Sequence, residues 1–460
     1  MKLAVVGIDG GSFELMNKWL DYLPALRKVK ERGCWADMQS ALPPVTSPNW
    51  KVYSTGMNPG KIGIFYWENI IWKERKVYYP TERKTQHKEI WDYLYEAGKK
   101  QVIMGIPLTY PPKKIWGFFI SGPPDASNKG FTYPSYLEKT LLKKGWKPGF
   151  DHSIITDREK AQKEIVEKIS TTFQMAREMV QAQNPDFLHV TSFYINELQH
   201  YLWDSECTKE GWIIIDNFVG WIQKQGYNLL VMSDHGSNEI KHTFNINTWL
   251  EHHGYLKLQG SSVGLRKLGI TQERLAGIIK SPAIISLLKR VIPNKVFETV
   301  PLEGGATTFN PKEKAVDWER SRVLASDQGP LYLRDRNDEV LIRALIRALE
   351  GIPEVVRGVY RGRDLYWGPY MDEAPDLVID YHDGIHISSG LGLKEVFSPP
   401  AEGRWKAENK RTAMFMGIGE EIYRTGKIDS VSILDLAPTI LTLMGVPIPE
   451  IMDGEDILKR

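Results

Sequence analysis

The sequence lacks the features that mark several classes of protein. Its 460 residues include only two cysteines, Cys34 and Cys207, and no C-x-x-C spacing. This scarcity excludes a disulfide framework and a thiolate metal site, and it is typical of a protein of the reducing cytoplasm. No stretch approaches the roughly 18 apolar residues of a membrane-spanning helix, and the apolar run at 3–8 is too short for a secretory signal. We therefore expect a cytoplasmic protein without a transmembrane segment.

Neither sign of charge predominates. Lys and Arg together number 59 and Asp and Glu 57, so the net charge is +2. Because a nucleic-acid-binding protein usually has a strong basic excess, we expect no nucleic-acid polymer as a partner. The hydrophobic share of 42% is that of an ordinary globular protein, and the length allows two or three domains or one large α/β unit with an insertion.

Short apolar runs alternate with helical patterns along most of the chain. The runs predict buried strands at 3–9, 101–106, 186–193, 228–236, 374–381 and 412–419, and the helical patterns lie at 158–183, 209–224, 339–350 and 433–444. This alternation predicts an α/β fold with a central, largely parallel sheet covered by helices on both faces. In such sheets functional groups collect beyond the carboxyl ends of the strands. The polar side chains at those positions are Asp9, Asn196, His200, Asp234 and His235.

Residues 258–310 interrupt this alternation, because they are helical in pattern, basic and without a strand-like run. We interpret them as a helical cap inserted into a catalytic core formed by 1–257 and 311–460. A basic amphipathic segment could contact a membrane surface or an acidic substrate. Charged helix faces are more often only solvated, so peripheral membrane contact is the less favoured interpretation.

The stretch PPVTSPNWKVYSTG, residues 43–56, places Thr46, Ser47 and Asn49 among prolines just before an apolar run. Taken alone, this pattern is typical of a turn and a helix cap. It would also suit a nucleophile at a helix N-terminus, where backbone N–H groups and the helix dipole favour a phosphate.

A second motif, MSDHG at 232–236, puts a carboxylate and an imidazole at a strand end. Together Asp9, Thr46, Asp234 and His235 offer four ligands to a divalent metal such as zinc or manganese. Spacing alone leaves open whether these side chains converge.

An ordered set of motifs resembles the type I phosphodiesterase and nucleotide pyrophosphatase branch of the alkaline phosphatase superfamily. The set comprises GIDGGSFEL at 7–15, TSPNWKVYSTGMNPGKIGIF at 46–65, INELQHYLW at 195–203, SDHGSNEIKHTFNINTWL at 233–250 and LDLAPTILTLMGVPIPEIMDG at 434–454. The resemblance covers nearly the whole chain. It implies an alkaline-phosphatase-like three-layer sandwich and a metal-dependent hydrolase acting on a small phosphate ester or phosphodiester.

The resemblance also implies roles for individual residues. Thr46 matches the nucleophile that forms a covalent phospho-enzyme, and Asn49 matches an amide that donates to a phosphate oxygen. The ligands of one metal site match Asp9, Thr46, Asp234 and His235, with zinc as the first choice and manganese as the second. Lys51 follows the nucleophile position by about one helical turn and could contact phosphate or be solvated.

The second metal site of the family is matched only in part. The motif D-x-x-x-H reads NELQH here, so Asn196 stands where Asp is expected and His200 is kept; Asn409 stands at about the position of a later His. An amide oxygen is a poorer zinc ligand than a carboxylate. Other side chains could complete the site or replace its charge: Glu197, His382, His386, Lys406, Lys410 and Arg411. We therefore expect one or two ions.

Three functions fit this pattern. The first is a phosphodiesterase, in which His200 binds a second metal or gives a proton to the leaving group. The second is a single-metal phosphotransferase or sulfatase-like enzyme. The third is a catalytically impaired protein that binds a phosphate-bearing ligand. The leaving group and the oligomeric state are not specified by the sequence.

Overall fold

The computed structural model describes residues 1–80, 86–149, 158–259, 311–400 and 405–459. Apart from its first two residues, the predicted cap at 258–310 lies outside these ranges. Its helical character and the division of the chain around it stay predictions. No helix in the described ranges is long and apolar enough to cross a membrane.

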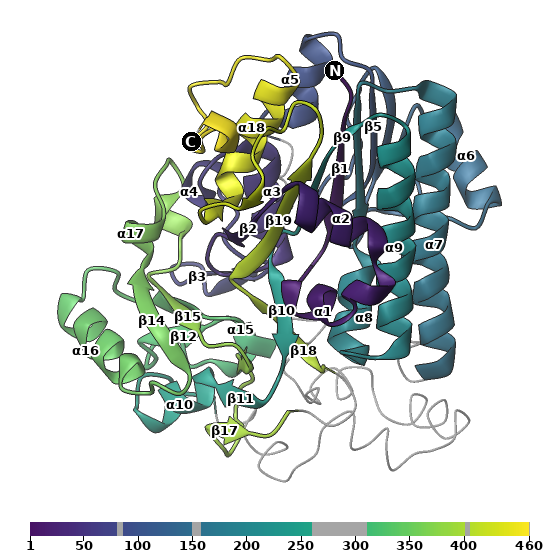
Figure 1. Ribbon diagram of the computed structural model, residues 1–460. Helices are drawn as coiled ribbons and strands as arrows, with labels where there is room; N and C mark the ends of the chain where they lie inside the picture. Colours follow the sequence, from purple (N-terminus) through teal and green to yellow (C-terminus); the bar gives the residue numbers. More distant parts are fainter. Residues whose placement is uncertain (81–85, 150–157, 260–310, 401–404, 460) are drawn as a thin grey trace.

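A ten-stranded mixed sheet forms the centre of the molecule (Figure 1). Its middle consists of five parallel strands in the order β9 (Asn228–Met232), β1 (Leu3–Ile8), β8 (Phe187–Ser192), β5 (Gln101–Ile106) and β6 (Gly117–Ser121). Next to β9, β19 (Thr412–Ile418) runs antiparallel between β9 and β2 (Cys34–Gln39). The short strands β7 (Thr132–Tyr133), β20 (Gly426–Lys427) and β21 (Val431–Ser432) extend the two edges. The predicted α/β fold with a central, largely parallel sheet is confirmed.

Helices cover both faces of this sheet, which gives three layers. Alternate residues of β1 enter two different apolar clusters: Leu3 and Val5 enter one, and Ala4, Val6 and Ile8 the other. The first cluster includes residues of α3 (Thr46–Thr55), α5 (Ile90–Glu96) and α18 (Leu436–Leu443). The second includes residues of α2 (Pro24–Arg32), α7 (Arg158–Gln183), α8 (Tyr194–Leu202) and α9 (Glu206–Lys224). Because both faces of β1 are covered, its sequence is a continuous apolar run.

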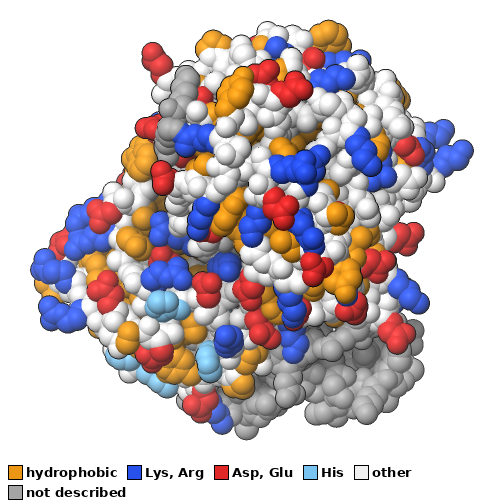
Figure 2. Space-filling model, in the orientation of Figure 1, with side chains coloured by type: hydrophobic (Ala, Val, Ile, Leu, Met, Phe, Trp, Pro, Cys, Tyr) orange, Lys and Arg blue, Asp and Glu red, His pale blue; other side chains and the backbone are white. Residues whose placement is uncertain are grey.

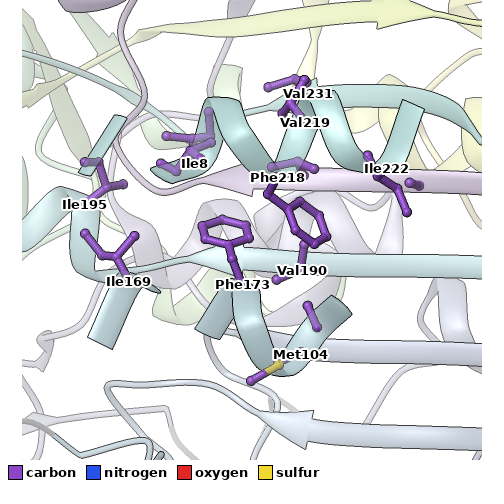
Figure 3. Packing of buried hydrophobic residues seen from close by; sticks show 14 of the residues in the cluster. Ile8, Met104, Ile169, Phe173, Val190, Ile195, Phe218, Val219, Ile222 and Val231 are labelled. Carbon is purple, nitrogen blue, oxygen red and sulfur yellow. The ribbon is translucent and has the colours of Figure 1, made fainter. Parts of the chain in front are cut away.

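The second cluster shows how the predicted helices pack on the strands. In Figure 3, Phe173 of α7 and Phe218 of α9 lie together over the sheet, close to Val190 of β8. Their ring centroids are 4.9 Å apart. Helix α9 begins after Ser205, whose hydroxyl accepts a hydrogen bond from the Thr208 N–H, as expected of a helix cap.

A smaller unit lies beside the main sheet. Its four-stranded antiparallel sheet has the order β12 (Val323–Ala325), β13 (Pro330–Leu333), β15 (Leu377–Tyr381) and β14 (Val356–Arg361). The helices α10 (Ile246–His252), α15 (Pro311–Ala315) and α16 (Glu339–Glu350) contribute to a separate apolar cluster with these strands. The predicted strand at 374–381 is therefore present, but it belongs to this second sheet, because a buried apolar run does not specify its partner strand.

Short ribbons connect the two parts. Strand β10 (Gly236–Glu239) pairs with β18 (Ala407–Lys410), and β11 (His242–Asn245) pairs with β16 (Ile385–Ser388) and β17 (Phe397–Ser398). In Figure 1, β10 and β18 lie at the lower end of the main sheet, beside the smaller unit. Apart from short 3₁₀ turns, the remaining elements of the described chain are α1 (Phe13–Lys18), α4 (Pro59–Ile62), β3 (Asn69–Ile71), β4 (Lys76–Tyr78), α6 (Tyr136–Lys143) and α17 (Gly362–Leu365). On the face drawn in Figure 2, basic and acidic side chains are interspersed, in agreement with the balanced charge.

Candidate active site

Two parallel strands bring the candidate metal ligands together. Asp9 follows β1, and Asp234 and His235 follow β9, which pairs directly with β1. Their ligand atoms all lie within 4.8 Å of one another, and the three side chains are fully buried. His235 Nε2 is 3.3 Å from Asp234 Oδ2 and 3.7 Å from Asp9 Oδ1. The structure thus brings these three side chains together, a question that their spacing in the sequence left open.

Each of the two carboxylates has one bonded oxygen and one free oxygen. Asp9 Oδ2 accepts a hydrogen bond from Trp50 Nε1 at 2.8 Å, and Asp234 Oδ1 accepts one from the Gly10 N–H at 3.1 Å. The other oxygens, Asp9 Oδ1 and Asp234 Oδ2, have no hydrogen-bond partner among the described residues. Buried carboxylate oxygens are normally satisfied, so two orphaned ones facing an imidazole fit a cation ligand set.

Thr46 contacts this cluster through His235. It is the first residue of α3, and its Oγ1 lies 3.1 Å from His235 Nε2. His235 Nδ1 is 2.9 Å from the carbonyl oxygen of Gly236. That carbonyl accepts the proton on Nδ1, so Nε2 presents a lone pair to the cluster. The Thr46 hydroxyl therefore contacts the same ring nitrogen that faces both free carboxylate oxygens.

Burial shapes the protonation of the cluster. Desolvation, reinforced by the charge of Asp234, holds the pKa of Asp9 well above its usual range, and desolvation raises the pKa of Asp234 to about 7. Desolvation also lowers the pKa of His235, against the opposing attraction of Asp9. Two neighbouring buried carboxylates are hard to ionise together, and the imidazole beside them is neutral. A bound divalent cation would stabilise both carboxylates in their ionised form.

Gly10 allows the close packing at this point. Its φ of +63° lies in the left-handed region, and a Cβ there would lie 2.3 Å from Asn196 Oδ1 and 2.6 Å from Ser237 Oγ. Its carbonyl oxygen accepts hydrogen bonds from Gln199 Nε2 and Ser237 Oγ. A side chain at position 10 would therefore clash with Asn196 and Ser237, and only glycine fits beside them.

The side chain of Asn49, in α3, forms its hydrogen bonds with the backbone of the loop that precedes this helix. Its Oδ1 accepts the Ala41 N–H at 2.8 Å, and its Nδ2 donates to the carbonyl oxygen of Val45 at 2.9 Å. The side chain is fully buried. In this structure the Asn49 amide holds the turn that presents Thr46, and its predicted contact with a phosphate oxygen stays a prediction.

The residues of the predicted second metal site lie at the same end of the sheet. Asn196 and His200 are one turn apart on α8, and Asn409 is on β18, opposite Ser237 of β10. Asn196 Oδ1 and Asn409 Oδ1 are buried and have no hydrogen-bond partner among the described residues. His200 Nδ1 is 2.8 Å from the Ala407 carbonyl oxygen, and burial lowers the pKa of His200 to about 4. This half of the site is consequently neutral.

A carboxylate that the sequence patterns did not single out lies beside this neutral half. Glu408 is fully buried on β18; its Oε1 accepts from Gln328 Nε2 at 2.5 Å, and its Oε2 contacts His386 Nδ1. Burial alone would raise the pKa of Glu408, but the nearby His386 and the hydrogen bonds outweigh it and lower that pKa. The one feature of the sequence that could have pointed to Glu408 is its position next to the candidate ligand Asn409.

Of the other side chains considered for this half, His386 is the one that contacts Glu408 directly. Burial raises the pKa of Glu197, on α8, to about 7. Arg411 Nη1 is 3.0 Å from Asp380 Oδ2, and Lys410 Nζ is 3.4 Å from Asp383 Oδ2. Both basic side chains are thus engaged with acidic residues of the smaller unit.

Comparison with known proteins shows the family of the chain. The family model of type I phosphodiesterase/nucleotide pyrophosphatase matches residues 3–398. The chain belongs to this family. No curated protein matches the chain. Among solved structures, it is similar to phosphonoacetate hydrolase from Sinorhizobium meliloti 1021 in complex with phosphonoformate, with 13% sequence identity, 96% of this chain and 95% of that chain covered, and a TM-score of 0.57.

As a member of the phosphodiesterase/nucleotide pyrophosphatase family, the chain is a phosphohydrolase, and the family is metal-dependent. The residues present fit such an ion, because Asp9 Oδ1 and Asp234 Oδ2 have no hydrogen-bond partner among the described residues and both face the Nε2 lone pair of His235, which the Thr46 hydroxyl also contacts. The family match ends before β18, so Glu408 and Asn409 lie outside it.

Proposed function

We propose that this protein hydrolyses a phosphodiester or related small phosphate ester with Thr46 as the nucleophile. The observation that carries the proposal is the position of Thr46 Oγ1, 3.1 Å from His235 Nε2 and at the first residue of a helix. Asp9, Asp234, His235 and Thr46 would hold one divalent cation, with zinc as the first choice and manganese as the second. Such an ion would lower the pKa of the Thr46 hydroxyl and offset the charge of the substrate.

The reaction then follows from the chain's own groups. Thr46 Oγ1 forms a bond to phosphorus while the bond from phosphorus to the leaving-group oxygen breaks, and the leaving group departs with a proton. Water next attacks the phospho-threonine, which releases the phosphoryl group and restores the hydroxyl. The N-terminus of α3 favours the anionic oxygens at this position because its first N–H groups have no partner within the helix. A neutral His200 suits a role as ligand of a second ion, because Nδ1 donates to the Ala407 carbonyl and Nε2 keeps a lone pair; the alternative, proton donation to the leaving group, would require His200 to take up a proton first.

The test combines metal content with turnover. Protein purified without added metal is analysed for bound ions and assayed on a chromogenic phosphodiester. Thr46→Ala should lower turnover by about a thousandfold or more, as expected for removal of a nucleophile. Thr55→Ala is the matched control, because Thr55 is buried at the other end of α3 and its hydroxyl bonds to the Lys51 carbonyl oxygen. Wild-type turnover in Thr46→Ala, or absence of bound metal and of turnover in the wild type, contradicts the proposal.

The neutral half of the site favours a second candidate, a single-metal phosphotransferase or sulfatase-like enzyme. Asn196 and Asn409 present amide groups where the family pattern has stronger ligands, so one ion per chain is the expected stoichiometry for that candidate. Bound zinc distinguishes the two: two ions with hydrolysis support the phosphodiesterase, and one ion with transfer to an added alcohol or with cleavage of a sulfate ester supports the alternative. A catalytically impaired ligand-binding protein would show neither reaction.

A further inference from the structure

Trp50 is placed to act on the metal centre through Asp9. It lies four residues after Thr46 on α3, so the two side chains are on the same face of the helix. Its indole Nε1 donates a hydrogen bond of 2.8 Å to Asp9 Oδ2, and the side chain is fully buried. A single helical turn therefore contacts the cluster twice, through Thr46 on His235 and through Trp50 on Asp9.

The hydrogen bond divides the two oxygens of Asp9. Oδ2 is held by the indole, and Oδ1 is the free oxygen that lies 3.7 Å from His235 Nε2. Without the indole, the carboxylate could rotate and its second oxygen would lose a buried donor. Groups that bond to metal ligands in this way fix the orientation of the ligand and raise its affinity for the ion.

The indole itself is rigidly seated. Its ring packs edge-on against Tyr53, with centroids 5.6 Å apart, and Tyr53 OH is 2.9 Å from His189 Nδ1 on β8. On the strand side, Gly7 of β1 leaves the space that the ring fills. A Cβ on Gly7 would lie 2.7 Å from Trp50 Cη2 and 2.7 Å from Thr191 Oγ1.

We propose that Trp50 is a positioning residue that sets the metal affinity of the site by orienting Asp9 and by tying this carboxylate to the helix that carries Thr46. The inference rests on the proposed function only in taking Asp9 as a ligand of the cation. It adds a requirement that the ligand set alone does not contain: the indole N–H must be present, and Gly7 must leave room for its ring.

The test is calorimetric titration of metal-free protein with zinc and with manganese. Trp50→Phe keeps an aromatic ring but removes the N–H donor, and we expect it to weaken metal affinity by about 10- to 100-fold. Turnover at saturating metal should recover largely, so the loss would appear in the metal dependence rather than in kcat. Trp212→Phe is the matched control, because Trp212 is equally buried and its Nε1 has no partner among the described residues. Its metal affinity should equal that of the wild type.

A second variant reaches the indole without removing it. Gly7→Ala should displace the ring and weaken metal binding in the same direction, although it alters no ligand. Wild-type affinity in a folded Trp50→Phe overturns the inference. If Trp50→Phe does not fold, the metal affinity of Gly7→Ala decides by the same criterion. If neither variant folds, Trp50 is required for folding as a whole, and the inference that it acts on metal affinity is overturned. Absence of metal binding in the wild type would instead contradict the proposed function.

Discussion

At the scale of single residues, the buried pair Asp9 and Asp234 makes metal binding depend on pH. Burial raises the pKa of Asp234 to about 7 and that of Asp9 well above its usual range. Between the usual carboxyl pKa of about 4 and pH 7, the two carboxyl groups keep their protons in the folded metal-free protein but have released them in the unfolded chain. Their contribution to the stability of the folded metal-free protein therefore falls as pH rises. A cation requires the ionised carboxylates. We expect the rise in Tm on adding zinc to be larger at pH 7.5 than at pH 5.5.

The comparison is made with and without the ion at each pH, because the buried histidines act in the opposite direction. Burial lowers the pKa of His235, lowers that of His200 to about 4 and lowers that of His189 to about 3, so each costs stability as pH falls below 6.5. In Asp234→Asn, most of the metal-induced rise in Tm should be absent at both pH values. An equal rise in wild-type Tm at pH 5.5 and 7.5 would contradict the expectation.

The sequence predicted the residues at the strand ends well and those held by tertiary contacts poorly. Asp9, Asp234 and His235 follow apolar runs, and parallel strands bring such positions to one edge. Glu408 could not be found in this way. Its burial comes from the packing of β18 against α8 and the smaller unit, and the residues that bond it, Gln328 and His386, are distant in the chain.

At the scale of elements, α3 is anchored by a buried ion pair close to the turn that carries Thr46. Lys51 Nζ is 2.6 Å from Glu89 Oε1, which also accepts the Ser54 hydroxyl, and both charged side chains are almost fully buried. Glu89→Ala would leave the Lys51 ammonium without its partner, so we expect a loss of about 3–5 kcal/mol in the free energy of unfolding, measured by urea denaturation. The sequence suggested that Lys51 either contacts phosphate or is solvated. In the structure it is instead buried and paired with Glu89.

The double variant Lys51→Met, Glu89→Leu separates charge from packing. Replacement of both partners by apolar groups of similar size is often neutral, so this variant should recover the part of the stability that Glu89→Ala loses through Lys51. The contacts of Glu89 with Lys113 and with the N-terminus of α5 stay lost in both variants. A single variant as stable as the wild type would show that the pair does not anchor the helix.

The sequence predicted whether an element is a helix or a strand, but it did not predict which strands pair with each other. The apolar runs at 101–106 and 374–381 look alike, yet one is β5 of the main sheet and the other is β15 of the smaller sheet. Local periodicity reports burial on both faces and carries no information on which strand lies alongside. For the same reason the antiparallel direction of β19 was not predicted.

At the scale of the whole molecule, Glu408 ties the connecting ribbons to the smaller unit. It lies on β18, which pairs with β10, and bonds to Gln328 of the smaller unit and to His386 on β16. Removal of this carboxylate by Glu408→Ala should cost about 3 kcal/mol and lower Tm, since charged hydrogen bonds are lost in a buried position. Glu239→Ala, on the exposed side of the neighbouring strand β10, is the control and should leave Tm nearly unchanged.

The cost should depend on pH in a defined direction. Although burial opposes it, Glu408 raises the pKa of His386, so the stabilisation from this pair is complete below about pH 6.5 and is lost as pH rises through the raised pKa. The difference in Tm between wild type and Glu408→Ala should therefore be larger at pH 6 than at pH 9. A difference that is constant with pH would exclude an ionic contribution from His386.

The position of β19 in the sheet has a consequence for the protein's biosynthesis. In the described part of the chain, β2 pairs only with β19, β20 and β21, and the second side of β9 is covered by β19. All three partners of β2 emerge from the ribosome several hundred residues after Gln39. Until then the nascent chain carries an unpaired strand and an open edge beside the future catalytic centre, which invites aggregation. A chaperone that shields these strands until Ile418 has been translated would raise the yield of active enzyme without altering its turnover.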